Sequence, residues 1–368
     1  MRATLLPLPT TDLGRLRERV KRLAEERPAV YRMVDPTGRV LYVGKARRLR
    51  TRLLSYFRAR YPDDKAARII HAAADVQWDY APSEFAALLG EIRAIKRFRP
   101  PLNVAGNRKR QAVFVTVLGG PAPRLAASRW PSPGRGEERV YGPFVSPRRV
   151  REGIRALNDL LGLRDCPPRM PMVFADQGDL FAEPRQAACL RHDIGQCLGP
   201  CAGLVTLERY GAAAAAAVAF LEARSVRPLD RVIDAMQRSA AEAEYEAATR
   251  WREKFEALEW LLSATVRARA AVELLTFVYR DPGTHGDDRA YLIRRGLVRA
   301  SFPYPTTPIE REAFQAAVAE ELAREVPEDA VLPVEGVDEM LVVMAWFRRH
   351  PEALRRTRPL EEWLPVAS

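Results

Sequence analysis

Histidine and long apolar runs are scarce in this chain. Only 4 of its 368 residues are histidine, and they are scattered rather than paired at metal-ligand spacing. Metal chemistry built on histidine is therefore not expected. No stretch approaches the roughly 20 consecutive apolar residues of a membrane-spanning helix. The first residues, MRATLLPLPTTDLG, lack the basic start, apolar run and cleavage site of a signal peptide. We expect a cytoplasmic protein with no membrane partner.

Cysteine is equally rare, but its distribution is informative. The four cysteines fall within one short segment, with 22, 7 and 3 residues between successive members, at Cys166, Cys189, Cys197 and Cys201. In a chain without a signal peptide, clustered cysteines favour metal ligation over disulfides. The spacing is not that of a standard zinc finger. All-cysteine ligation suits an iron–sulfur cluster or tetrahedral zinc, and inert buried thiols are the alternative.

Positive charge is plentiful and unevenly placed. The net charge is +12 and the estimated pI is about 9.9. Residues 28–110 alone hold 18 Lys/Arg against 7 Asp/Glu, so most of the excess lies there. A basic surface that served only solubility would be spread more evenly. Concentrated positive charge suits a polyanion, because neutralised phosphates release their counterions. Nucleic acid is the expected partner.

Apolar periodicity and chain breakers predict an α+β protein. Helices are expected over 12–26, 46–60, 84–98, 147–162, 206–262, 309–325 and 337–349. Strands are expected over 29–34, 40–43 and 111–118, and within 272–298. Residues 120–140 are rich in Pro, Gly and Arg and predict an exposed connection.

Two short strand-like runs near the N-terminus carry the first motif. Val30-Tyr31 and Tyr42-Val43-Gly44 flank Asp35-Pro36-Thr37-Gly38, which is a hairpin turn pattern. The pair resembles the tyrosine strands of GIY-YIG nucleases. Ala29-Val30-Tyr31 stands in place of GIY, and Tyr42-Val43-Gly44 stands in place of YIG.

A basic segment follows the second strand. Spacings of four, three and four residues predict one shared helical face for Lys45, Leu49, Arg52 and Tyr56. That face would bring two cations and a phenol next to Tyr42. The remaining arginines are expected on a solvated face, in nonspecific contact with phosphates: Arg47, Arg48 and Arg50.

Glu91 is a carboxylate on an apolar helical face. Glu84, Leu88, Glu91 and Ile95 fall on one stripe of the helix that Ser83 would cap. A buried carboxylate without a partner is costly, so Glu91 should have a cation. A metal ion is the functional alternative, and an ion pair with Arg52 is the structural one.

Two longer stretches resemble UvrC-type repair nucleases: LYVGKARRLRTRLLSYF and SEFAALLGEIRAIKRFRPPLN. The resemblance implies Tyr31 and Tyr42 at the water or scissile phosphate, charge stabilisation by Lys45 and Arg52, and phosphate positioning by Tyr56. It also implies that Glu91 binds the single divalent metal and that Asn103 completes the pocket.

Both the metal and the catalytic base can be argued from chemistry. One carboxylate with several waters suits Mg²⁺ or Mn²⁺. A free tyrosine titrates near pH 10. We therefore expect Lys45 and Arg52 to lower that pKa, and we favour Tyr42 as the base.

The cysteine segment resembles the same family. The stretches CLRHDIGQCLGPC and YGPFVSPRRVREGIRALNDLLGLRDC carry the resemblance. It implies an iron–sulfur cluster on Cys166, Cys189, Cys197 and Cys201, with zinc as the alternative.

Two amphipathic stripes with a break near residues 242–245 predict a helical hairpin. The stripes contain Val232, Met236 and Ala240, then Ala248, Trp251, Phe255 and Leu258. Within it, AEYEAATRWREKFEALE resembles the UVR motif through which UvrB and UvrC associate. The resemblance implies UvrB as a partner, whereas the alternative is a hairpin that only packs internally.

The predicted organisation runs from a lead-in helix (1–27) to a small GIY-YIG α/β nuclease domain (28–106). A connecting region with the cysteine cluster (107–205), a helical UVR-like region (206–262) and a mixed α/β C-terminal region (263–368) follow. No acidic triad of a second, RNase-H-like nuclease is seen in 306–368. We therefore expect a short homologue similar to Cho.

The expected function is one metal-dependent cut on the 3′ side of a lesion in double-stranded DNA. UvrB would prepare that DNA, and UvrA would act indirectly. The alternatives are a non-catalytic adaptor for DNA and UvrB, and a nuclease that recognises DNA structure without UvrB.

Overall fold

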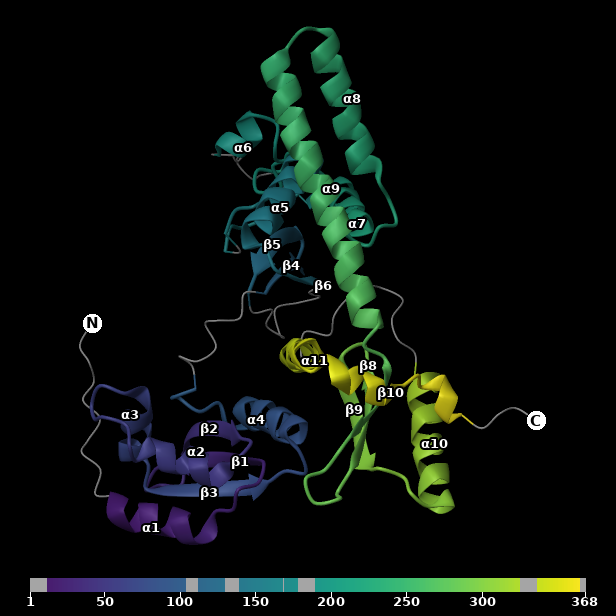
Figure 1. The fold of residues 1–368 in the computed structure, drawn as a ribbon. Coiled ribbons are helices and arrows are strands. Elements are labelled where there is room, and N and C mark those ends of the chain that lie inside the picture. The colour runs from purple at the N-terminus through teal and green to yellow at the C-terminus, as the bar shows by residue number, and fades with distance from the viewer. Residues whose placement is uncertain are drawn as a thin grey trace. The chain divides into compact units, whose positions relative to one another are not determined.

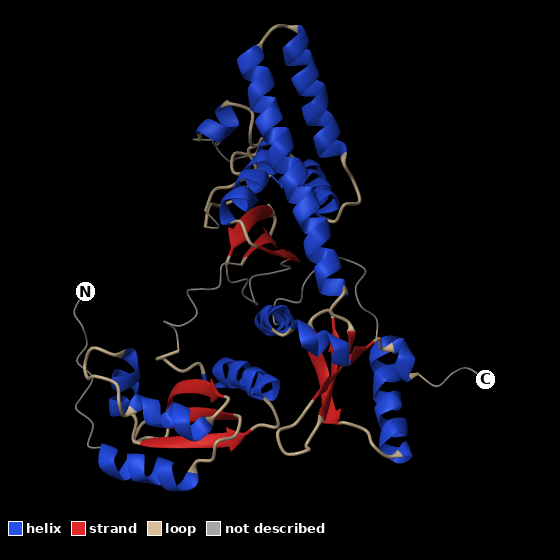
Figure 2. Cartoon of the chain, viewed as in Figure 1, coloured by secondary structure: helices blue, strands red, loops and turns tan. Residues whose placement is uncertain are grey.

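The computed structural model describes residues 12–103, 112–129, 139–167, 169–177, 189–324 and 336–364. Helices and strands occur throughout these residues, which confirms the α+β prediction (Figure 2). None of the helices described is long and apolar enough to cross a bilayer. The chain divides into two compact units. The first takes the described parts of Met1–Arg110, Leu275–Glu325 and Asp338–Ser368, and the second those of Gln111–Leu274 and Val326–Val337.

A three-stranded antiparallel sheet forms the first part of unit one (Figure 1). Its order is β2-β1-β3, with bounds β1 (Ala29–Val34), β2 (Val40–Ala46) and β3 (Asp75–Tyr80). The helices around it are α1 (Leu13–Leu23), α2 (Leu49–Tyr56), α3 (Lys65–Ala72) and α4 (Glu84–Phe98). The β1–β2 hairpin is confirmed, and Gly38 supplies the positive φ of 84° in its turn.

Both faces of this sheet are covered. Tyr31 and Met33 of β1 pack with residues of α1, α2 and α3. Val30, which points to the opposite face, packs with Ala87 of α4. The approach of α4 is close, because a Cβ on Gly90 would lie 2.9 Å from Cγ2 of Val30.

A second antiparallel sheet belongs to the same unit. Its order is β10-β7-β8-β9, with bounds β7 (Phe277–Asp281), β8 (Arg289–Arg294), β9 (Leu297–Pro303) and β10 (Thr357–Arg358). Helices α10 (Pro308–Ala323) and α11 (Val337–Arg349) agree with the prediction, and short 3-10 helices span Pro351–Arg356 and Glu361–Trp363. Phe314 of α10 packs with Val278, whereas Phe347 of α11 packs with Phe277. The two helices therefore cover opposite faces.

Unit two has its own small sheet and helical core. Its strands are β4 (Val113–Leu118), β5 (Arg124–Ser128) and β6 (Arg139–Phe144), in the order β5-β4-β6. Helices of this unit are α5 (Pro147–Leu161), α6 (Leu190–Asp193), α7 (Leu207–Leu221), α8 (Arg227–Ala241) and α9 (Tyr245–Glu273), with a 3-10 turn at Ala175–Gln177. One apolar core joins the sheet to α5, α7 and α9.

The predicted helical hairpin is confirmed. Helices α8 and α9 lie side by side, and the chain reverses between Ala241 and Tyr245 (Figure 1). Ala243 holds a positive φ of 59° at this turn. Val232 and Leu258 are buried, whereas Tyr245 is 73% exposed.

Three local predictions were wrong. The basic helix is α2, which is shorter than 46–60, because the β1–β2 ladder continues to the pair Ala29–Ala46. Lys45 therefore lies on a strand. The sequence analysis also missed α3 and β3. Residues 124–128 form β5 rather than part of an exposed connection, because they pair with β4.

Gly153→Ala should destabilise unit two. A Cβ at this position of α5 would lie 2.8 Å from Cβ of Leu261 and 3.1 Å from the Ala257 carbonyl oxygen. We expect chemical denaturation to show about 1–3 kcal/mol less unfolding free energy, the usual range for overpacking. Gly211→Ala on α7 is the control. No described atom lies within 4 Å of its Cβ beyond its own helix backbone, so it should stabilise by about 1 kcal/mol. Equal effects would contradict the packing argument.

Candidate active site

Two tyrosines on neighbouring strands form the centre of the site. Tyr31 pairs with Gly44 in the β1–β2 ladder, and Tyr42 lies two residues before Gly44. Both tyrosines therefore point to the same face of the sheet. A Cβ on Gly44 would lie 2.5 Å from the Tyr31 hydroxyl. Glycine at this position leaves the space that the Tyr31 ring occupies.

Tyr56 of α2 completes a cluster of three rings. Its hydroxyl lies 2.8 Å from that of Tyr31, and either oxygen can donate. The centroid of the Tyr42 ring is 6.3 Å from those of Tyr31 and Tyr56. Tyr31 and Tyr56 are buried, whereas Tyr42 is half-buried. Tyr42 is thus the member of the cluster that reaches the surface.

Arg52 binds the two buried hydroxyls. Its Nε donates to the Tyr31 hydroxyl at 3.2 Å and its Nη2 to the Tyr56 hydroxyl at 3.4 Å. Its guanidinium also lies 5.1 Å from the centre of the Tyr56 ring. The predicted closeness of Arg52 to these tyrosines is therefore found in the structure.

The expected lowering of the tyrosine pKa was wrong in direction. Burial raises the pKa of Tyr31 to about 12, and the neighbouring Tyr42 adds to the effect while Arg52 opposes it. Burial also raises the pKa of Tyr42, with Tyr56 and the Glu91 charge acting in the same direction. The positive charge of the partly exposed Arg52 lowers these pKa values by less than the removal of the rings from water raises them.

Lys45 belongs to a different face from the tyrosines. It follows Gly44 on β2, so its side chain points to the side of the sheet that α4 covers. There its Nζ lies 3.1 Å from Oε1 of Glu84. The predicted single helical face with Arg52 and Tyr56 was therefore wrong, because Lys45 is not helical.

Glu91 lies on α4, where it is half-buried. Its negative charge is one of the smaller causes that raise the pKa of Tyr42, after burial and Tyr56, so the two groups interact through space. Within the described residues, no group of three or more His, Cys, Asp or Glu side chains is arranged to hold one metal ion.

Asn103 closes the outer edge of β2. Its Oδ1 accepts from the Val43 backbone N–H and its Nδ2 donates to the Val43 carbonyl, each at 2.8 Å. The preceding Leu102 N–H donates to the Leu41 carbonyl at 3.0 Å. The amide side chain thus replaces a peptide group of a fourth strand and holds the backbone beside Tyr42.

Lys65 is a cation that the sequence analysis missed. Its Nζ lies 5.8 Å from the centre of the Tyr42 ring, on the first residue of α3. A cation over an aromatic face is attracted by the ring quadrupole. No motif surrounds Lys65, so it could have been found only by predicting α3.

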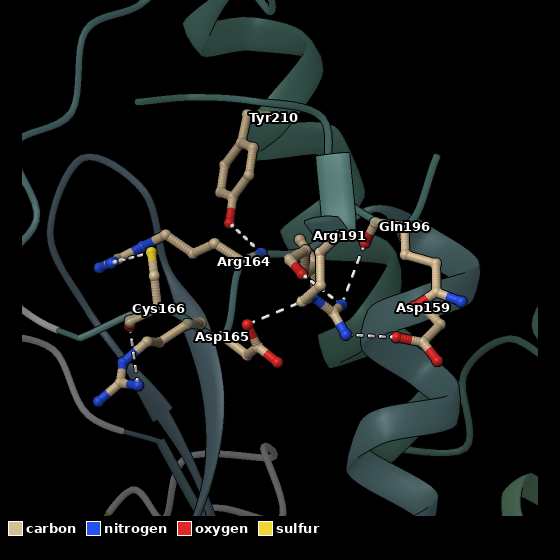
Figure 3. A network of polar contacts seen from close by, with 9 residues as sticks. Asp159, Arg164, Asp165, Cys166, Arg191, Gln196 and Tyr210 are labelled. Carbon is tan, nitrogen blue, oxygen red and sulfur yellow. Dashed lines mark hydrogen bonds and ion pairs between the residues drawn. The ribbon is translucent and has the colours of Figure 1, made fainter. Parts of the chain in front are cut away.

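Arginine side chains hold the cysteine segment in unit two (Figure 3). Arg124 donates to the Cys166 carbonyl at 3.2 Å. Arg191 donates to Asp159 at 2.7 Å and to the Gln196 carbonyl at 3.1 Å, and it pairs with Asp165 at 3.3 Å. Arg164 donates from its backbone to the Tyr210 hydroxyl at 3.1 Å. Its guanidinium lies 3.5 Å from Sγ of Cys166.

All four cysteines line one cavity of about 380 Å³, together with Arg164 and Arg191. Burial raises the pKa of the Cys197 thiol, and repulsion from the charges of the other three adds to it. Burial likewise raises the pKa of Cys201. The fold therefore brings to one cavity four thiols that are separated in sequence by 22, 7 and 3 intervening residues, although no three of these described side chains are placed to hold one metal ion.

Two protein families match this chain. Residues 27–104 match the UvrC-like GIY-YIG domain, and residues 114–220 match the UvrC/Cho excinuclease middle domain.

Among individual proteins, UvrABC system protein C of Pseudoalteromonas atlantica is 29% identical over 339 residues, covering 87% of this chain and 53% of that protein. The protein of the same name from Novosphingobium aromaticivorans is 32% identical over 327 residues, covering 87% and 47%. The chain thus spans about half the length of these relatives.

A solved structure of the GIY-YIG N-terminal endonuclease domain of UvrC from Thermotoga maritima, bound to magnesium, is 34% identical. It covers 25% of this chain and 100% of that one, with a TM-score of 0.23.

The sheet, the tyrosine cluster and the family match define a GIY-YIG endonuclease domain. With the matching middle domain and the curated relatives, they show that the chain belongs to the UvrC family.

Gly44→Ala should displace the Tyr31 ring and break its bond to Tyr56. The new Cβ would overlap both the ring carbon and the hydroxyl of Tyr31 at 2.5 Å. We expect about 1–3 kcal/mol less unfolding free energy in chemical denaturation. In a Tyr31→Leu background the same change should cost much less. A cost that is equal in the two backgrounds would show that the Tyr31 contact is not the cause.

Proposed function

We propose that this chain is a metal-dependent DNA endonuclease of nucleotide excision repair that acts in the cytoplasm. It hydrolyses one phosphodiester bond on the 3′ side of a lesion, in double-stranded DNA that UvrB has prepared with the help of UvrA. The observation that carries the proposal is the cluster of Tyr31, Tyr56 and Arg52 behind Tyr42, with Glu91 close by. Family membership and the names of the relatives support the pathway.

Tyr42 is the residue proposed to meet the attacking water. It is the half-buried tyrosine of the cluster, and its hydroxyl would hydrogen-bond the water. To act as the base it would first lose its own proton to solvent, and the resulting phenolate would take the proton of the water. Burial opposes that loss, whereas the positive charges of Lys65 and of a divalent cation at the site would favour it. Arg52 is exposed to solvent although it donates hydrogen bonds to Tyr31 and Tyr56. The exposed side of its guanidinium can therefore contact the phosphate. Lys65, beside Tyr42, adds a second positive charge there.

Glu91 is the proposed ligand of the divalent cation, Mg²⁺ or Mn²⁺. A half-buried carboxylate next to Tyr42 fits such an ion, because Mg²⁺ in phosphate chemistry binds one or two carboxylates and keeps several waters. When bound, the ion supplies Lewis-acid stabilisation of the developing charge.

The remaining site residues position these groups. Tyr31 and Tyr56 are buried and hydrogen-bonded to each other, so they hold Arg52 rather than substrate. Asn103 keeps the Tyr42 strand in register through Val43. Lys45 forms an ion pair with Glu84 at the start of α4.

The hairpin of α8 and α9 is the proposed site for UvrB. Its tip leaves Tyr245 73% exposed, which suits docking of a second amphipathic hairpin. Trp251 and Phe255 pack partly into the core of unit two, so the tip rather than the base is available.

An iron–sulfur cluster on the four cysteines is the proposed second cofactor. Cys166, Cys189, Cys197 and Cys201 provide an all-sulfur donor set around one cavity of about 380 Å³. Tetrahedral zinc is the alternative for the same donor set. The resemblance of the cysteine segment to UvrC proteins is what favours the iron–sulfur cluster.

Protein purified without oxygen should contain iron and inorganic sulfide and absorb broadly in the visible range. Cys201→Ser should lose most of both, because it removes one of four thiolate ligands. Elemental analysis and absorption spectra measure this. Stoichiometric zinc without iron would support the zinc alternative. The absence of both metals would indicate that the four thiols are inert.

Glu91→Gln should abolish incision. The assay uses an end-labelled duplex with one bulky lesion and Mg²⁺, with and without UvrA and UvrB. We expect a single 3′ cut by the wild type that requires UvrB. Glu91→Gln should lower the rate by about 100-fold or more, a usual cost of losing one charge-stabilising group.

Glu18→Gln on α1 is the matched control, since Glu18 is exposed and its carboxylate pairs with Lys21 of the same helix. It should cut normally. Cutting of branched DNA without UvrB would favour a nuclease that recognises DNA structure. UvrB binding with no cutting of either substrate would favour the adaptor.

A further inference from the structure

The hydroxyl of Ser83 joins two parts of unit one. It caps α4 by accepting a hydrogen bond from the Ala86 backbone N–H at 3.0 Å. The same hydroxyl donates to the carboxylate of Asp281 on β7. Asp281 is 3% exposed, so this bond lies inside the protein. One side chain thus fixes both the start of α4 and its place against the C-terminal sheet, β7 to β10.

Backbone contacts continue this junction. The Pro82 carbonyl, just before the cap, accepts from the Thr284 backbone N–H at 2.9 Å and from its hydroxyl at 3.2 Å. Further along α4, Arg93 lies 3.3 Å from Glu339 of α11. Residues from the C-terminal part of unit one therefore contact α4 along more than two of its turns.

Phe85 is the apolar anchor of the junction. It is fully buried, and the rings of Tyr279 and Tyr291 meet it edge-on at centroid distances of 5.2 and 5.0 Å. Trp346 of α11 lies 5.3 Å away. Leu89, one helical turn later, is buried in the same cluster.

Asp281 is a buried carboxylate that the proposed chemistry does not use. Burial raises its pKa to about 6, while hydrogen bonds from Ser83 and Tyr279 act in the opposite direction. A buried charge is costly unless it is well hydrogen-bonded. The positive end of the α4 dipole adds a favourable interaction at this position.

Helix α4 connects this junction to the active site. One of its faces packs on the nuclease sheet through Ala87, and a second packs on the C-terminal sheet through Phe85 and Leu89. Glu84, next to the cap, holds Lys45. Glu91, two turns further on, lies near Tyr42. A shift of the start of α4 would move both carboxylates relative to β2.

We propose that the C-terminal sheet is a positioning element of the nuclease, in which Asp281 fixes Glu84 and Glu91 through Ser83. The inference rests on the proposed function, because it gives residues 275–364 a role in the cleavage step. The hydrogen bonds of the Asp281 carboxylate come from Ser83 and Tyr279, so it would act on the site through α4. It is a positioning residue.

The test uses the full chain with Asp281→Ala, Asp281→Asn, Ser83→Ala and the Asp281→Ala/Ser83→Ala double variant. We expect Asp281→Ala to lower kcat for incision by about 10- to 100-fold, since a shift of about 1 Å can cost about 100-fold. KM for DNA should change little, and the Mg²⁺ concentration that gives half-maximal activity should rise. Asp281→Asn should recover part of the loss, and the two changes should not be additive.

Glu321→Gln is the matched control. Glu321 is also a buried carboxylate of the C-terminal region, but it pairs with Arg294, Arg299 and Arg324 rather than with α4. It should lower stability without raising the Mg²⁺ requirement. If both variants lowered kcat in proportion to lost stability, with no change in Mg²⁺ dependence, the positioning role would be overturned.

A second readout separates this inference from the proposed function. Hydrogen exchange of the α4 amides should speed up in Asp281→Ala and not in Glu321→Gln, whether or not the wild type cuts DNA. Unchanged exchange in Asp281→Ala would refute the junction itself. A wild type that does not cut, with faster exchange in the variant, would refute only the proposed function.

Discussion

The missing side chain at Gly44 decides where the tyrosine rings lie. Because Gly44 faces Tyr31 across the β1–β2 ladder, the Tyr31 ring can cross over β2 instead of being pushed away from it. From that position its hydroxyl reaches Tyr56 on α2, and the pair forms the acceptor to which Arg52 binds. Tyr42, on the same strand as Gly44, is then left at the surface of the cluster. The positions of the two buried hydroxyls and of the half-buried Tyr42 phenol therefore depend on one contact.

The second constraint is that α4 packs against two sheets. Small residues such as Gly90 let it approach β1, and Phe85 enters the aromatic cluster of the C-terminal sheet. An amphipathic helix normally has one apolar stripe and a broad polar face. With two of its faces buried, α4 has little freedom to rotate, and the carboxylates between those faces are held in place. This arrangement explains why Glu91 can sit near Tyr42 although the two belong to different elements.

Much of this could be predicted from sequence where the information was local. Two short strand-like runs on either side of a DPTG turn predicted the β1–β2 hairpin, and the Ser83 cap predicted α4. The position of Lys45 could not be predicted, because four-residue spacing fits a helix while the end of a strand ladder depends on its partner. Lys65 was missed because α3 has only eight residues, too few to show a clear apolar period, although Pro62 and the N-cap Asp64 mark its start. The bond between Ser83 and Asp281 joins residues 198 positions apart and leaves no periodic pattern.

The cations of the nuclease divide into two groups with different physical roles. Arg52 and Lys45 are bound by protein groups, and Arg50 donates to the Ala24 carbonyl at 2.5 Å. Their charge is partly used inside the protein, so they define geometry more than they add to affinity. Arg47 is exposed just before α2 and can neutralise phosphates along the backbone, as can Arg48, whose exposed guanidinium lies 3.7 Å from Glu26. Salt weakens contacts of the second kind steeply, because it opposes counterion release, but it screens partly buried pairs much less. In the proposed function, affinity for DNA and placement of the scissile phosphate would thus be governed by different arginines, so that a domain without base-reading contacts could still fix one reacting bond.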